Sequence, residues 1–92
     1  MAWFVFELRR HDRTTTELEQ FPLLETALKY GIDDLMRMSR ANARVSIGVG
    51  EVRGAEVDWL GELSLDAQGR PTWNSTNLRE REAAAGEAEP WR

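Results

Sequence analysis

Residues 56–65, EVDWLGELSL, alternate between apolar and polar side chains over most of their length. Apolar side chains take positions 57, 59, 63 and 65, and acidic or hydroxyl-bearing ones take positions 56, 58, 62 and 64. Because successive side chains of a strand point to opposite faces, the pattern predicts a strand with one apolar and one acidic, solvent-facing side. It places Trp59 in the core and Leu60 on the opposite, charged face.

The neighbouring segments extend this strand into a sheet. Residues 44–52 predict a second strand, joined to the first by a turn at 53–55, and residues 71–75 predict a short edge strand after a turn at 66–69. Near the N-terminus, residues 3–8 predict a strand that is apolar on both faces, with Trp3 and Val5 on the second face.

A helix separates the first strand from the others. Residues 9–16 are polar and predict a loop that ends in a helix cap at Thr15 or Thr16. Apolar residues then recur at three- and four-residue steps from Pro22 to about Asn42, which predicts a helix that Gly31 either interrupts or leaves whole.

These elements predict an α+β fold, in which a three- or four-stranded antiparallel sheet packs on one helix, broken or unbroken. The order is strand, helix, strand, strand, with the edge strand as an optional fourth. Ninety-two residues support one domain, which we expect over residues 1–78, followed by a polar, flexible tail at 79–92.

Composition narrows the functional classes. There is no cysteine and one histidine, His11, so we expect no metal and no cofactor. The net charge of −4 disfavours general nucleic-acid binding. No apolar run approaches the roughly 18 residues of a membrane span, and the N-terminus lacks a signal-peptide pattern, so we expect a cytoplasmic location and no membrane partner.

The favoured functional hypothesis is a small, non-catalytic protein-binding module, such as a regulator, an inhibitor or an immunity-type factor. Its predicted surface is an acidic hairpin face with an apolar anchor, which would attract a basic partner. An apolar patch of Trp3, Val5 and Leu60 on the second sheet face predicts burial against another chain, which includes a homodimer, or against the tail. The predicted protein-binding residues are Glu51, Glu56, Asp58, Leu60, Glu62 and Trp3.

A second hypothesis is an anion- or small-ligand-binding protein, or an enzyme, that uses the segment 9–13. This segment gathers Arg9, Arg10 and Arg13 around His11, and such side chains recognise phosphate and exchange protons near neutral pH.

A third hypothesis is DNA binding. Within residues 26–44, Ala27 followed four residues later by Gly31 and then by Ile32 resembles the turn of helix-turn-helix proteins. The resemblance covers about one-fifth of the chain and implies a DNA-binding regulator. Arg37, Arg40 and Arg44 would then contact phosphates. Arg37 and Arg40 stand where that family places apolar residues of its second helix.

Overall fold

The computed structural model describes residues 1–40 and 44–76, so the tail predicted at 79–92 lies outside the described residues. In chain order the elements are β1 (Ala2–Arg9), β2 (Thr14–Phe21), α1 (Leu24–Ser39), β3 (Ser46–Arg53), β4 (Glu56–Leu65) and β5 (Pro71–Ser75).

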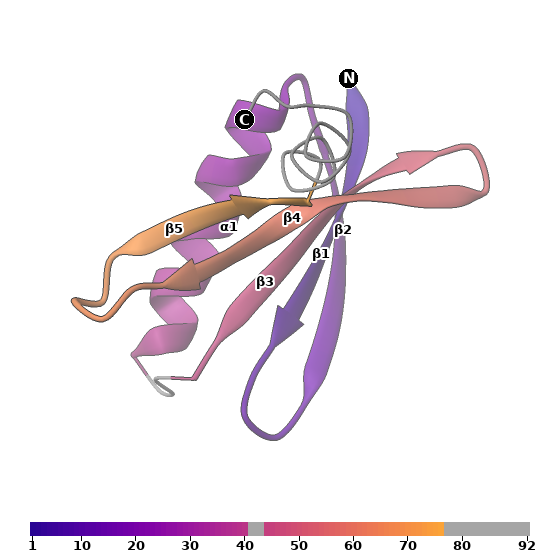
Figure 1. Cartoon of the computed structure of the whole chain (residues 1–92). Helices are drawn as coiled ribbons and strands as arrows, with labels where there is room; N and C mark the ends of the chain where they lie inside the picture. Colours follow the sequence, from indigo (N-terminus) through magenta and orange to yellow (C-terminus); the bar gives the residue numbers. More distant parts are fainter. Residues whose placement is uncertain (41–43, 77–92) are drawn as a thin grey trace, which may run out of the picture.

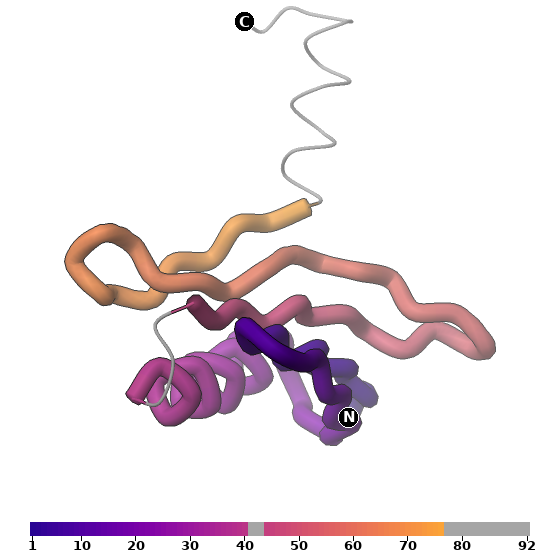
Figure 2. Tube along the Cα trace, turned by 90° about the horizontal axis from the view of Figure 1, so that it is seen from below, coloured from indigo at the N-terminus to yellow at the C-terminus, as the bar shows by residue number. Residues whose placement is uncertain are grey.

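The strands form one antiparallel sheet in the order β2-β1-β3-β4-β5, and α1 lies along one of its faces (Figure 1). This confirms the α+β class and the antiparallel sheet with one helix. The sheet has five strands, one more than the largest number predicted. The tip of the β3–β4 hairpin projects away from α1 in both views (Figures 1 and 2).

The additional strand is β2, which occupies the segment predicted as a loop and helix cap. Its residues pair with β1 along the whole length, from Ala2 opposite Phe21 to Arg9 opposite Thr14. The side chain of Phe21 packs beside Phe4 and Phe6 at ring-centroid distances of 6.3 and 6.0 Å. These nonlocal pairings and aromatic contacts compensate for the weak alternation of the segment, which is rich in threonine, a good strand former.

Helix α1 is continuous through Gly31, so of the two alternatives left open by the sequence the unbroken helix is the one present. It begins at Leu24 after Leu23, which gives no side-chain cap, so Thr15 and Thr16 play no capping role. A Cβ atom at Gly31 would lie 2.7 Å from Cδ1 of Leu63 on β4. The glycine therefore lets the helix approach the sheet closely. This packing offsets the cost of about 1 kcal/mol that glycine brings to a helix interior.

The core lies between α1 and the face of the sheet that carries Phe4, Phe6 and Leu8. The members from β3 and β4 are Ile47, Val49, Leu60 and Leu63, and those from α1 are Ala27, Leu35 and Met38.

A β-bulge in β4 decides which side chains of that strand reach the core. Val49 of β3 pairs with Gly61, but the next residue, Gly50, pairs with Trp59, so Leu60 is an extra residue in β4. An extra residue reverses the facing of the positions on one side of it. Leu60 is 7% exposed and belongs to the core, whereas Trp59 is 41% exposed. Both orientations predicted from the alternation are therefore wrong.

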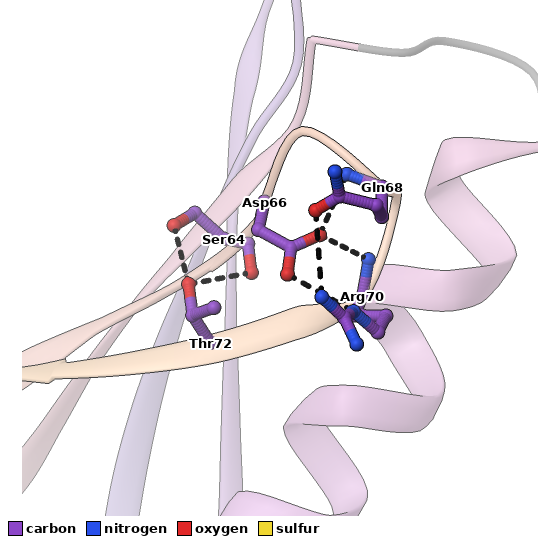
Figure 3. A network of polar contacts seen from close by, with 5 residues as sticks. All are labelled: Ser64, Asp66, Gln68, Arg70 and Thr72. Carbon is purple, nitrogen blue, oxygen red and sulfur yellow. Dashed lines mark hydrogen bonds and ion pairs between the residues drawn. The ribbon is translucent and has the colours of Figure 1, made fainter.

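The turn between β4 and β5 is closed by Asp66 (Figure 3). One carboxylate oxygen accepts the backbone N–H groups of Gln68 at 2.9 Å and Arg70 at 2.8 Å, and the other accepts Nε of Arg70 at 3.2 Å. These bonds, the Arg70 N–H first, lower the pKa of Asp66. Gly69 has the predicted positive φ, 80°.

Candidate functional site

The face of the sheet opposite α1, called the open face below, carries no covering element in the part of the chain that the structure describes (Figures 1 and 2). The strand pairing places Leu18, Val5, Gly50 and Trp59 side by side in one row across β2, β1, β3 and β4. Such a row crosses four strands of a single surface.

One half of the open face is apolar, and we call it the aromatic patch: Trp3, Val5, Leu18, Val57 and Trp59. Trp3 is 47% exposed and Leu18 is 54% exposed. The side chains of Val57 and Trp59 lie over Gly50, because a Cβ atom there would come within 2.6 Å of the valine and 2.9 Å of the indole. Gly50 therefore lets two large side chains lie flat on the sheet while they remain partly open to solvent.

The other half of the open face is polar, but its charges are paired. Among the strand residues of this face, the charged ones are Glu7, Arg9 and Glu62. The Arg9 guanidinium donates to Glu7 at 2.8 Å and to Glu62 at 2.5 Å, lying across Gly48. The open face therefore joins exposed aromatic rings to an ion-pair network in which one guanidinium serves two carboxylates.

The predicted acidic hairpin face is divided between the two sides of the sheet. Because of the bulge, Glu51, Glu56 and Asp58 share the helix side at the hairpin tip, whereas Glu62 lies on the open face. Arg53 pairs with Glu51 at 3.1 Å and with Asp58 at 3.5 Å.

Of the two predicted apolar anchors, only Trp3 is exposed. Leu60 is in the core and presents no surface to a partner. Trp59 lies on the open face, where Leu60 was predicted. Gly61 within the strand pattern is the signal that could have indicated the bulge, since a glycine inside a strand often marks one.

The predicted anion site lies in the turn between β1 and β2. The N–H of Arg10 donates to the carbonyl of Arg13 at 2.8 Å, which closes the turn, and its guanidinium donates to Thr15 at 3.1 Å. His11 and Arg13 are exposed, and Arg9 is engaged on the open face. Arg9, one of the predicted residues, is thus occupied by carboxylates of the open face.

The helix-turn-helix resemblance fails on the fold. Residues 24–39 form one helix where that motif needs two helices joined by a turn, and Arg37 pairs with Asp34 of the same helix. Within residues 1–40 and 44–76, no group of three or more acidic or histidine side chains could hold a metal ion. No helix of the same ranges has the length and apolar character that crossing a membrane requires.

A pair of carboxyl groups between β2 and α1 was not predicted. Asp34 is 6% exposed, and its Oδ2 has no hydrogen-bond partner among the described groups. Glu17 accepts the Tyr30 hydroxyl at 2.9 Å. Burial, followed by a hydrogen bond with Asp34, raises the pKa of Glu17. The pKa of Tyr30 is raised as well, by burial and by Glu17. These residues are far apart in sequence, so no local pattern could have indicated the pair.

A scan against protein-family models, a search of curated proteins and a search of solved structures each returned no match to this chain.

Proposed function

We propose that the chain is a non-catalytic protein-binding module whose partner covers the open face. The observation that carries this proposal is the aromatic patch, which exposes two tryptophans next to charges that are already paired with one another. Interface centres are enriched in aromatic side chains and depleted in unpaired charge, whereas ordinary solvent-facing sheet surfaces are polar.

The surroundings of the patch define the chemistry of the partner. On the open face itself, two carboxylates, Glu7 and Glu62, stand against one guanidinium, Arg9, which leaves a local charge of −1 (two negative and one positive). The whole chain carries −4. The partner accordingly presents an apolar surface bordered by lysine or arginine, and the association weakens as salt is added.

Matched affinity capture tests this proposal. The wild-type chain is compared with the double variant Val57→Thr and Trp59→Thr, which removes the β4 part of the patch while keeping good strand formers. Met36→Gln is the control, because Met36 is an exposed apolar residue on the solvent side of α1.

We expect a set of proteins that wild type and control retain and that the double variant loses, with circular dichroism showing all three folded. Identical capture by the three chains would overturn the proposal. A wild-type dimer that the double variant converts to a monomer would also overturn the proposal, because the open face would then be the contact between two copies of the chain.

A further inference from the structure

The two edges of the sheet differ in how well they are protected. β5 is five residues long and begins with Pro71, which is a common way to blunt an edge strand. β2 is eight residues long, pairs with β1 without a register shift and contains neither proline nor lysine. A long, regular edge with unpaired backbone groups is a template for another strand.

The side chains of β2 show which strand would fit. Glu17 and Glu19 point to the helix side, and Leu18 between them points to the open face beside Val5. Glu19 is exposed and forms no ion pair within the described residues. A strand added outside β2 would therefore place two side chains against carboxylates and the one between them against a leucine.

Self-pairing of β2 is disfavoured by the same pattern. In an antiparallel pair of two copies related by a twofold axis, residues of one face oppose residues of the same face. A pair centred on Leu18 sets Glu17 against Glu19 of the second copy, and a pair centred on Glu17 sets two Glu17 carboxylates opposite each other. Like charges directly opposite in a sheet are destabilising, so the two registers that would pair the most residues of β2 are disfavoured for a second copy.

We propose that β2 accepts an extended segment of a partner protein that carries a basic, apolar, basic sequence opposite Glu19, Leu18 and Glu17. This inference rests on the proposed function, protein binding, and adds the place and the chemistry of the bound segment. Backbone hydrogen bonds to the free side of β2 supply affinity, and the alternating side chains supply specificity. The apolar residue of the segment would extend the row formed by Leu18, Val5 and Trp59.

The probe is a synthetic peptide with a central lysine–valine–lysine flanked by threonines. Its controls are the same peptide with glutamate in place of both lysines, and the same peptide with alternate backbone nitrogens methylated to block strand pairing. Binding is followed by NMR titration of the full chain, together with amide hydrogen exchange in Thr14–Phe21.

We expect the lysine peptide to slow exchange in β2, and both control peptides to bind at least tenfold more weakly. In the protein, Glu19→Lys should weaken binding about tenfold, whereas Asp33→Lys, the same charge change on the exposed side of α1, should leave it within twofold. Binding without protection of β2 amides, equal binding of the glutamate peptide, or no binding at millimolar peptide would overturn the inference.

The double variant Val57→Thr and Trp59→Thr separates the two proposals. This variant should bind the peptide as the wild type does. If it also loses the proteins that the wild type captures, the open-face proposal and the β2 inference are both supported. A folded double variant that loses the peptide would show that the peptide occupies the open face, and the β2 inference would be wrong. Retained peptide binding with unchanged protein capture would overturn the open-face proposal alone.

Discussion

At the residue scale, burial raises the pKa of Glu17, and the neighbouring buried Asp34 adds to the shift. Oδ2 has no ordinary donor, and Glu17 is the group placed to supply one, because the two carboxyl groups are hydrogen-bonded when Glu17 carries a proton. Arg37 pairs with the other oxygen of Asp34, and Tyr30 donates to Glu17. Burial and these neighbours therefore raise the pKa of Glu17 above that of an exposed glutamate.

The first prediction is that Glu17→Gln stabilises the protein at neutral pH. The folded pKa of Glu17 is raised above its ordinary value of 4.5. The stability that its proton contributes is therefore present below about 4.5 and is lost as pH rises through the raised value. Glutamine donates to Asp34 at every pH and should add about 1 kcal/mol to the free energy of unfolding at pH 7.5.

Urea denaturation at pH 7.5 and pH 4 checks this, with Glu19→Gln as the exposed control. The gain should shrink toward pH 4, where wild-type Glu17 is protonated. A Glu17→Gln protein less stable than the wild type at both pH values would contradict the raised pKa of Glu17.

The second residue-scale prediction contrasts two glycines of the sheet. A Cβ atom at Gly61 would lie 2.4 Å from the backbone carbonyl oxygen of Asn74 and 2.8 Å from the Trp73 ring, whereas at Gly48 it would meet the mobile end of Arg9 at 2.5 Å. Gly61→Ala should cost at least about 2 kcal/mol, and Gly48→Ala should stay within about 1 kcal/mol, because only the arginine can move aside.

Thermal or urea unfolding of the two variants measures both costs. Equal costs would show that β5 does not hold Asn74 and Trp73 over Gly61 as described.

At the scale of elements, the bulge in β4 exchanges the environments of two adjacent large side chains. It lies where β3 presents Gly50, over which Trp59 rests, and where β5 presents Trp73, whose ring lies over Gly61. Gly50 thus makes room for the Trp59 indole on the open face, and Gly61 makes room for the Trp73 indole on the helix side. The bulge joins core packing to the exposed patch, because it buries Leu60 while it turns Trp59 outward.

We predict that Leu60→Ala is much more destabilising than Trp59→Thr, although tryptophan is the larger residue. Removing the buried leucine should cost about 2–4 kcal/mol through lost burial and a residual cavity. Removing Trp59, which is partly solvated, should cost about 1 kcal/mol. Chemical denaturation of both variants is the measurement, and the reverse ranking would show that the strand alternates regularly through position 60.

At the scale of the whole molecule, the fold is one-sided. In residues 1–40 and 44–76, a single helix covers one face of a five-stranded sheet, and the other face exposes an aromatic patch. The charge is arranged to resist self-association, since the chain carries −4 overall and the β2 edge carries Glu17 and Glu19. This charge opposes the approach of a second copy.

We therefore predict a monomer in solution, with the 10.5 kDa mass of the chain, whose melting temperature does not depend on protein concentration. Light scattering after size exclusion, at two protein and two salt concentrations, measures this directly. Salt screens the repulsion between copies, so twice the expected mass at high salt alone would mean that charge is what keeps the copies apart. Twice the mass under all conditions would contradict the prediction and assign the open face to self-association.

Where a segment carried a strong local period, its element was predictable. The apolar stripe of α1 and the β-branched and aromatic runs of β1, β3 and β4 are local signals. The turn glycines Gly54 and Gly69 have the positive φ that suits such turns. β2 has no such signal, because Leu18 faces solvent and Glu17 and Glu19 occupy the helix side, so only its pairing with β1 reveals it.

The candidate site was predicted in part for the same reason. Trp3 on the second face follows from alternation along β1, and the structure places it there. Leu60 was predicted to be exposed on β4 when Trp59 is, and the acidic residues were assigned to one face when they lie on two. Each of these errors comes from one extra residue in β4.

The sequence by itself thus determined the α+β class, the helix, four of the strands and their turns, because these depend on side-chain period and backbone preference within a few residues. The tertiary structure alone decided the edge strand β2, the bulge at Leu60 and the membership of the aromatic patch. Those depend on backbone hydrogen bonds between strands distant in sequence and on which glycines can accept a facing ring, and no local pattern encodes either.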